Sequence, residues 1–277
     1  MTTREAYVEV GRITRREARN FAWGIALLPG PKRRAVTALY AFARRVDDIA
    51  DGGQPDTERR RRLEECRAGV EALPASPDGD AVLVALGDAM VRYPIPRAVL
   101  LDLVRGGLMD VERSRYATWE ELREYCCCVA GAVGLACTAI YGPSDSETAR
   151  PRAETLGLAL QQINIMRDVA EDWDLGRVYL PRDELEQFGV SEEDIAAARV
   201  TAEWRALMEH QALRAEELLR EGLALLALLD RRSALCVRAF AGIYRGLLLQ
   251  MRERDFDVFS SRPALSAVGK VRAVAAL

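Results

Sequence analysis

The sequence is poor in the features that mark nucleic-acid binding and histidine-based chemistry. Its net charge is -3, and its arginines are interspersed with acids instead of forming a basic stripe, so no nucleic-acid partner is expected. The single histidine, His210, lies in the polar stretch EWRALMEHQ, which favours a surface position and argues against a Ser/His/Asp triad. No GxxxxGK loop is present, so the sequence does not predict a nucleoside triphosphate site.

Signals for secretion and for membrane spans are also scarce. The N-terminal stretch MTTREAYVEVGRITRR lacks the apolar core of a signal peptide, and we therefore expect a cytoplasmic protein. The longest uncharged run, 125–144, is nominally long enough to cross a bilayer, but it is rich in Ala and Cys and closes with Gly-Pro-Ser, which favours a buried helix. Six cysteines, three of them consecutive at 126–128, fit neither a disulfide framework nor a zinc spacing, so reduced core thiols are expected.

Alternating strand patterns are missing, whereas apolar residues recur with a helical period along almost the whole chain. One helix is expected to start at Pro29-Gly30-Pro31 and to end at Gly52-Gly53. The sequence predicts one all-α domain over 1–277, because no break has the composition of a linker. Further helices are expected near 4–26, 57–73, 80–92, 97–111, 118–141, 147–173, 192–200, 201–229 and 231–253, with breaks at 74–79, 93–96, 142–151 and 175–190.

Three carboxylates crowd the end of the helix that starts near Pro29, where the helix macrodipole disfavours negative charge. Tyr40, Arg44, Asp47 and Asp51 follow steps of four, three and four, so they form one stripe, and Asp48 lies alongside it. One interpretation is a solvated helix end whose acids pair with neighbouring arginines. The other is a site for a divalent cation, since carboxylate oxygens are the ligands that Mg²⁺ prefers.

A second polar stripe favours the metal interpretation. In LQQINIMRDVAEDWDLGRVYLP, the residues Gln161, Asn164, Asp168 and Asp172 again fall at three- and four-residue steps. Two such stripes facing each other would hold a diphosphate through bridging Mg²⁺, because this ion combines a few carboxylates with substrate phosphate oxygens. A diphosphate without a nucleotide loop, in an apolar helical cavity, indicates an isoprenoid substrate. Arginines beside the stripes would contact the phosphates: Arg44, Arg167 and Arg177.

Three blocks of the chain together resemble the squalene/phytoene synthase family. They are NFAWGIALLPGPKRRAVTALYAFARRVDDIADG, YATWEELREYCCCVAGAVG and LALQQINIMRDVAEDWDLGRVYLP, in the family's order and at fitting separations, and the likeness extends over roughly 15–260. The resemblance implies a helical bundle of the isoprenoid synthase type with a central prenyl cavity. Within the family the chain looks most similar to bacterial presqualene diphosphate synthases.

The resemblance also implies roles for individual residues, carried over to the positions that match the family's motifs. The catalytic residues would be Tyr40, Arg44, Tyr125, Arg167 and Tyr179. The metal ligands would be Asp47, Asp48, Asp51, Asn164, Asp168 and Asp172. Substrate would be bound by Arg44, Gln161, Arg167, Arg177 and Tyr244, with Val129, Ala130 and Gly134 lining the prenyl tunnel. A phosphate-binding Arg expected near the end of the chain does not align, because Ser261 occupies its place and Arg262 follows one residue later.

The implied reaction is a head-to-head condensation of two prenyl diphosphates, with two farnesyl diphosphates giving presqualene diphosphate as the first prediction. Ionisation of the donor would need Mg²⁺, with Mn²⁺ as an alternative ion, and Tyr125 or the released diphosphate would take up the proton lost on cyclopropane closure. Onward conversion to squalene, with or without NADPH, is left open, since the absence of a GxGxxG fingerprint argues only weakly against this cofactor.

Several alternatives remain beside this prediction. Phytoene synthase and dehydrosqualene synthase activities are the nearest, and a non-catalytic relative that acts as an assembly factor is the most distant, although both acidic stripes are intact. A terpene cyclase is disfavoured by the Asn-Asp-Asp spacing of the second stripe, and a chain-elongating enzyme by the absence of a full DDxxD there. The tail ALSAVGKVRAVAAL either makes a transient peripheral membrane contact or packs on the bundle as a terminal helix. The sequence makes no prediction about the oligomeric state.

Overall fold

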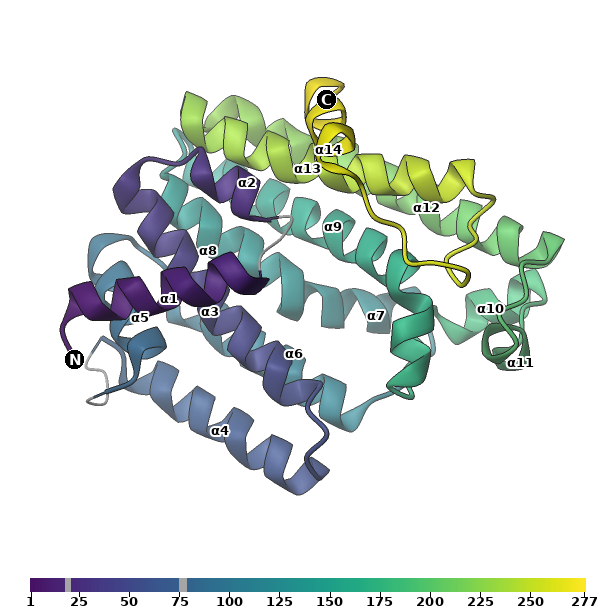
Figure 1. Cartoon of the computed structure of the whole chain (residues 1–277), viewed down its shortest axis with the longest axis horizontal. Coiled ribbons are helices and arrows are strands. Elements are labelled where there is room, and N and C mark those ends of the chain that lie inside the picture. The colour runs from purple at the N-terminus through teal and green to yellow at the C-terminus, as the bar shows by residue number, and fades with distance from the viewer. Residues whose placement is uncertain (18–20, 75–78) are drawn as a thin grey trace.

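The computed structural model describes residues 1–17, 21–74 and 79–277, and helices make up most of it (Figure 1). No strand forms within these ranges, where an isolated bridge pairs Arg115 with Val178. The all-α prediction is therefore confirmed. The helices of the N-terminal half are α1 (Thr3–Glu17), α2 (Phe21–Ala26), α3 (Gly30–Ala50), α4 (Asp56–Ala72), α5 (Ala81–Arg92), α6 (Arg97–Glu112) and α7 (Trp119–Cys126).

The C-terminal half continues the bundle with longer helices. A π-helical segment, η1 (Cys127–Gly131), joins α7 to the next helix, and a 3-10 segment, η2 (Leu223–Leu228), follows α12. Free cysteines occupy all six positions, as expected. The helices are α8 (Ala132–Tyr141), α9 (Ser146–Asp174), α10 (Arg182–Phe188), α11 (Glu192–Ala196), α12 (Ala202–Gly222), α13 (Arg231–Glu253) and α14 (Ala267–Ala275).

Local signals explain many helix boundaries. The side chain of Asp80 accepts hydrogen bonds from the first backbone amides of α5, and Asp145, Thr201 and Asp230 do the same for α9, α12 and α13. Gly142 ends α8 in the left-handed conformation, at φ 64°, which a residue without a Cβ adopts readily. Sequence alone therefore located most ends to within a few residues.

Several expected boundaries were wrong. The helix expected over 4–26 is described as α1 and α2, and the expectation for 18–20 falls outside the described residues. The expected break at 175–190 contains α10, because Pro181 starts a short helix that ends at Gly189. The helix expected over 118–141 is interrupted by η1, and the one expected over 201–229 ends in η2. These changes of helical type leave the apolar period nearly intact, so the sequence pattern did not reveal them.

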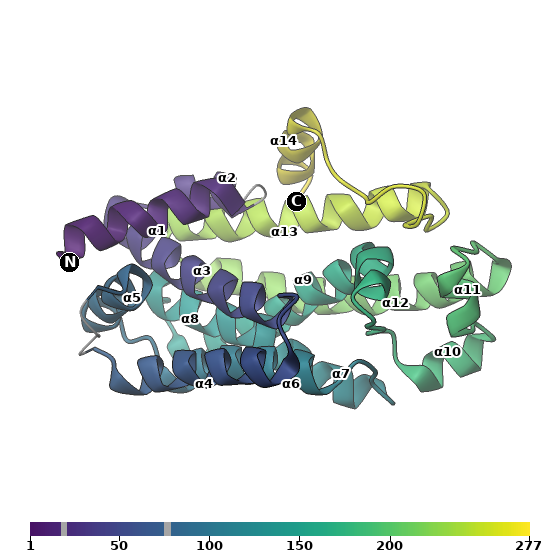
Figure 2. The same cartoon turned by 60° about the horizontal axis from the view of Figure 1, so that its bottom comes forward.

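Two buried clusters of apolar side chains hold the helices together. One lies around α1, α3, α5 and α6, the other around α9, α12 and α13, and Leu160 and Leu218 pack against both. Figure 2 shows α1 and α13 on one side of the bundle, α4 and α6 on the opposite side, and α9 between them. The long helix α9 is therefore central, with α8 and α12 against it.

Two glycines allow α9 to approach η1 and α8 closely. A Cβ added to Gly157 would lie 2.4 Å from the carbonyl oxygen of Ala130, and one added to Gly134 would lie 2.4 Å from that of Ala153. Real side chains do not tolerate such contacts, so both positions require glycine unless the backbones separate. The sequence analysis attributed Gly134 to space for the prenyl chain; the structure shows that its lack of a side chain also sets the helix spacing.

Two helical stretches are long and apolar enough to cross a membrane by length and composition alone: Trp119–Tyr141 and Arg231–Glu253. About half of each apolar window is buried inside the bundle, at 50% and 56%. Core helices of soluble proteins pass the same test, so this is weak evidence for membrane spans.

Candidate active site

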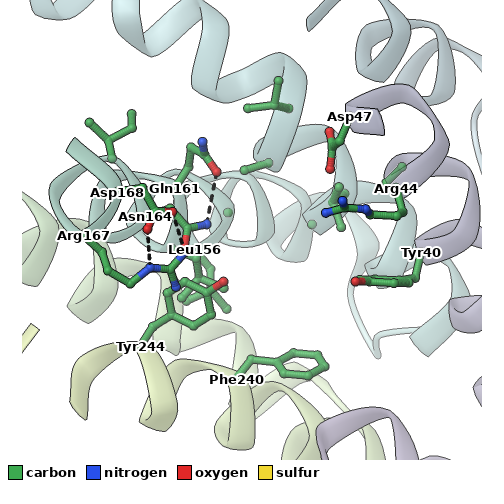
Figure 3. Close-up of a pocket in the computed structure, with 18 of the residues that line it drawn as sticks. Tyr40, Arg44, Asp47, Leu156, Gln161, Asn164, Arg167, Asp168, Phe240 and Tyr244 are labelled. Carbon is green, nitrogen blue, oxygen red and sulfur yellow. Dashed lines mark hydrogen bonds and ion pairs between the residues drawn. The ribbon is translucent and has the colours of Figure 1, made fainter. Parts of the chain in front are cut away.

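A cavity of about 990 Å³ lies inside the bundle, with a polar side and an apolar side. Charged groups from α3, α6, α9 and the C-terminal segment line the polar side, and aliphatic and aromatic residues line the rest. Figure 3 shows that Tyr40, Arg44 and Asp47 of α3 face Gln161, Asn164 and Asp168 of α9 across this space. The two stripes predicted from sequence therefore meet in one cavity.

The first stripe reaches the cavity with all four of its residues, whereas the neighbouring Asp48 does not. Tyr40, Arg44, Asp47 and Asp51 line the cavity wall. Asp48 does not line the cavity: its side chain is 54% exposed and pairs with Arg44 at 2.6 Å. One residue of helix rotates the Asp48 side chain about 100° away from that of Asp47, so the structure does not bring it together with the other acids, and its role as a metal ligand stays a prediction.

The second stripe lines the opposite wall with all four of its residues, Gln161, Asn164, Asp168 and Asp172. Its neighbour Arg167 forms a two-pronged ion pair with Asp168, at 2.7 Å from Nε to Oδ1 and 2.5 Å from the terminal nitrogen to Oδ2. The amide nitrogen of Asn164 lies 3.4 Å from Gln161 Oε1. Asn164 Oδ1 is buried and finds no hydrogen-bond partner among the described residues, so this oxygen is available to a ligand.

The C-terminal segment supplies a basic group that the sequence alignment left open. Arg262 lines the cavity, with its Nε 2.9 Å from Asp168 Oδ1 and a terminal nitrogen 3.1 Å from Glu171 Oε2. Ser261 instead accepts a hydrogen bond from Arg254. The irregular chain after α13 can turn the Arg262 side chain inward despite the shift of one residue, which a sequence motif alone does not show.

Arg177 connects the end of α9 to the end of α3. One of its terminal nitrogens lies 2.5 Å from Asp51 Oδ1, and the other donates to the carbonyl oxygen of Ala50 at 3.0 Å. The Arg177 side chain is buried, so the pair holds the two acidic walls at a fixed separation. The Arg177 guanidinium also donates to a carbonyl oxygen at the C-terminal end of α3, where the last carbonyls lack partners within the helix.

The acidic groups are crowded in the protein alone. Burial raises the pKa of Asp172 to about 8, and the neighbouring Asp168 carboxylate adds to this shift. Burial likewise raises the pKa of Asp47 to about 7, and the neighbouring Asp51 carboxylate is the next cause. Protein atoms surround the Asp47 side chain, but its carboxylate is exposed to the cavity. Both shifts disfavour the ionised forms, and a bound cation would reverse them.

The donor set fits Mg²⁺ when substrate contributes ligands. Carboxylates on two facing walls and the unpartnered oxygen of Asn164 are hard oxygen ligands. Within 1–17, 21–74 and 79–277, no three His, Cys, Asp or Glu side chains lie close enough together to hold an ion by themselves. Water and phosphate oxygens would therefore complete the coordination of an ion in this cavity.

The apolar side of the cavity is formed by the residues that were expected to line a prenyl tunnel. Val129, Ala130 and Gly134 all line it, and the π-helical segment η1 carries the first two. Tyr244 of α13 is buried beside Asn164 and Arg167 (Figure 3). The wall continues inward with Val36, Leu39, Val133, Leu156, Leu225, Val237 and Phe240.

Sequence reasoning missed one buried acid at the cavity. Asp110 lies in the last turn of α6, lines the cavity, and accepts hydrogen bonds from Tyr125 and Tyr179. A signal was present, because Asp110 follows the buried residues Leu103 and Gly107 at helical spacing and so occupies the core face of α6. The lone His210 does not line the cavity and is 41% exposed, as expected.

Known proteins resemble this chain over nearly its whole length. The family described as squalene/phytoene synthase matches residues 14–268. A phytoene synthase of Mycobacterium tuberculosis is 42% identical over 275 residues, which cover 98% of this chain and 90% of that protein. Both findings agree with the resemblance of the three sequence blocks.

Solved structures share the fold. A dehydrosqualene synthase in complex with a ligand superposes with a TM-score of 0.88 at 28% identity, over 99% of this chain and 95% of that one. A squalene synthase from Alicyclobacillus acidocaldarius gives a TM-score of 0.84 at 30% identity, over 92% of this chain and 95% of that one. The arrangement of helices is thus common to these proteins.

Proposed function

Because the chain belongs to the squalene/phytoene synthase family of head-to-head prenyl synthases, we propose that it condenses two geranylgeranyl diphosphates and forms phytoene. The observation that supports this product is the 42% identity to a phytoene synthase over 98% of the chain. The first prediction from sequence, presqualene diphosphate from two farnesyl diphosphates, is not confirmed. It remains the second candidate, because the superposed structures are a dehydrosqualene and a squalene synthase.

The polar side of the cavity would bind the two diphosphates. Asp47 and Asp51 on one wall, with Asn164, Asp168 and Asp172 on the other, would hold Mg²⁺. The ion would offset the negative charge of the leaving diphosphate. Five cations among the described residues line the same cavity and would bind phosphate oxygens directly: Arg44, Arg167, Arg177, Arg262 and Lys270. Arginines now paired with aspartates would exchange these partners for phosphate when substrate enters.

The apolar side would hold the prenyl chains and exclude water from the allylic cation. Attack by the C2=C3 bond of the second substrate on this cation, followed by loss of a proton, would close a cyclopropane ring that still carries one diphosphate. Tyr125 lies at the cavity wall and would receive that proton or pass it to the released diphosphate. Phytoene would then form when the second diphosphate leaves, the cyclopropane ring rearranges and opens, and a second proton is lost. Side chains such as Val129, Leu156 and Phe240 offer no nucleophile that could trap the cation.

Product analysis tests the chain length. We expect the purified protein with Mg²⁺ to convert geranylgeranyl diphosphate to a C40 hydrocarbon faster than it converts farnesyl diphosphate to any C30 product, as measured by mass spectrometry of the extract. Parallel reactions with NADPH decide whether this reductant changes the product. A C30 product alone would favour the second candidate, and no product from either substrate would support a non-catalytic role.

We further propose a cytoplasmic enzyme that touches membranes transiently through α14. This helix packs on α13, yet Val268 and Val271 remain 61% and 57% exposed, next to Lys270 and Arg272. Deletion of the tail would also remove residues that line the cavity. The double substitution Val268→Ser, Val271→Ser therefore tests membrane contact more specifically.

We expect these two substitutions to reduce co-sedimentation with anionic liposomes and to leave the thermal midpoint unchanged. Val91→Ser on α5, where the valine is 72% exposed, is the matched control and should not affect co-sedimentation. Equal binding by all three proteins would contradict a membrane role for α14.

A further inference from the structure

Two tyrosine hydroxyls converge on one carboxylate at the cavity wall. Tyr179 donates a hydrogen bond to Asp110 Oδ1 at 2.6 Å, and Tyr125 donates one to Asp110 Oδ2 at 3.0 Å. The two hydroxyl oxygens lie 3.3 Å apart, and all three residues line the cavity. They come from α6, α7 and the chain after α9, so only the folded bundle brings them together.

Aromatic packing fixes the positions of these two rings. The rings of Tyr125 and Tyr179 stack with their centroids 5.1 Å apart and their planes at 21°. Tyr116, which is 1% exposed and does not line the cavity, packs against both rings at 5.5 and 5.9 Å. Rotation about the C–O bonds is therefore the main freedom left to the two hydroxyls.

The protons of this cluster can be counted. Each tyrosine hydroxyl carries one proton and two lone pairs, whereas an ionised Asp110 only accepts. If Tyr125 turns its proton to Tyr179 instead, Tyr179 still donates to Asp110, so in either arrangement both phenolic protons stay within the cluster. Each hydroxyl oxygen therefore keeps at least one lone pair that no partner in the cluster uses, and both tyrosines line the cavity.

The ionised form of Asp110 is supported by its neighbours. Burial raises the pKa of Asp110 to about 6, while Arg177 and the hydrogen bonds from Tyr179 and Tyr125 oppose this shift. Above this value the carboxylate is charged and accepts both bonds.

We infer that Asp110 is a positioning residue that keeps the hydroxyl protons of Tyr125 and Tyr179 away from the cavity, so that oxygen lone pairs face the prenyl cation. The inference rests on the proposed function. A hydroxyl that donates to a carboxylate is more electron-rich at oxygen, and it stabilises positive charge that develops in front of it. The same oxygen is then able to accept a proton, whereas a hydroxyl turned the other way would present a positive end to the cation.

Asp110→Asn tests the orientation directly, because the amide offers a donor where the carboxylate only accepts. One tyrosine must then accept from the amide and can turn its own proton into the cavity. We expect kcat for prenyl transfer to fall by about 10- to 100-fold. The KM for geranylgeranyl diphosphate should stay near its wild-type value, because the cluster faces the cation and does not hold the diphosphate.

A matched control is available elsewhere in the bundle. Asp88 on α5 accepts a hydrogen bond from Tyr7 at 2.8 Å, outside the cavity lining. Asp88→Asn therefore makes the same change from carboxylate to amide at a tyrosine contact, here with Arg92 also bound to the carboxylate, and should leave kcat unchanged. A coupling test compares the double variant Tyr125→Phe, Tyr179→Phe with the triple variant that also carries Asp110→Asn. Once both hydroxyls are absent, Asp110→Asn should cause no further loss of kcat.

Each other outcome overturns the inference or one of its premises. Wild-type kcat in Asp110→Asn, a raised KM with unchanged kcat, or a full additional loss in the triple variant would each overturn the positioning role. No product from the wild type with geranylgeranyl or farnesyl diphosphate would overturn the proposed function instead. If Asp110→Asn does not fold, as judged by its thermal midpoint, unchanged kcat in both Tyr125→Phe and Tyr179→Phe would still overturn the inference.

Discussion

Asp47→Asn and Asp168→Asn should each lower the rate of prenyl transfer by about 100-fold or more, because in the proposed function each removes a metal ligand from the place where diphosphate charge would develop. The two variants should differ in stability. Asp47 is crowded by Asp51 in the protein alone, so its neutralisation should maintain or slightly raise the thermal midpoint. Asp168 pairs with the buried Arg167 and with Arg262, so its replacement should cost about 1–3 kcal/mol of unfolding free energy.

Asp48→Asn is the informative comparison for these variants. The Asp48 carboxylate is one residue from Asp47 but lies outside the cavity. The activity of Asp48→Asn should therefore stay much closer to that of the wild type. Product formation and thermal melting of the three variants test which of these carboxylates act in the cavity. If Asp47→Asn retained full turnover, or if Asp48→Asn were as inactive as Asp47→Asn, the assignment of cavity and surface carboxylates on α3 would be wrong.

Removal of Mg²⁺ should abolish turnover, and readdition of Mg²⁺ or Mn²⁺ to the chelated protein should restore it, because the wall carboxylates do not complete a metal site without substrate phosphate. The pKa values add a dependence on pH. Since the pKa of Asp47 and of Asp172 is raised in the folded protein, the folded state holds more protons than the unfolded state below these values. The unfolding free energy without Mg²⁺ should therefore fall as pH rises toward about 8.

Mg²⁺ held by Asp47 and Asp172 would require their ionised forms, so its binding should release protons and should raise the thermal midpoint more above the Asp172 pKa of about 8 than below the Asp47 pKa of about 7. Melting curves with Mg²⁺ and diphosphate, at pH values on either side of this interval, measure the effect. A Mg²⁺ stabilisation that does not change with pH, or full turnover in excess chelator, would contradict a role for these acids as ligands.

The fold class and the two polar walls could be predicted because they follow from local periodicity. Helical spacing placed Tyr40, Arg44, Asp47 and Asp51 on one side of α3 and Gln161, Asn164, Asp168 and Asp172 on one side of α9. Spacing within one helix is set by its geometry and does not depend on the partners of that helix. The expectation that the two stripes face each other came from their shared fitness for Mg²⁺ and a diphosphate, and the family resemblance agreed with it.

Contacts between distant segments were decided only by tertiary structure. Asp110 was missed because its role depends on Tyr125 and Tyr179, which other elements bring to it, and the inward turn of Arg262 depends on an irregular segment without a period. Asp48 lies outside the cavity because its proximity in sequence to Asp47 does not give its side chain the same direction. By itself, the sequence determined which residues share a helix face; the packing of α3, α6, α9 and the C-terminal segment determined which faces share a cavity, since that depends on side-chain volumes and close approaches such as Gly157 against Ala130.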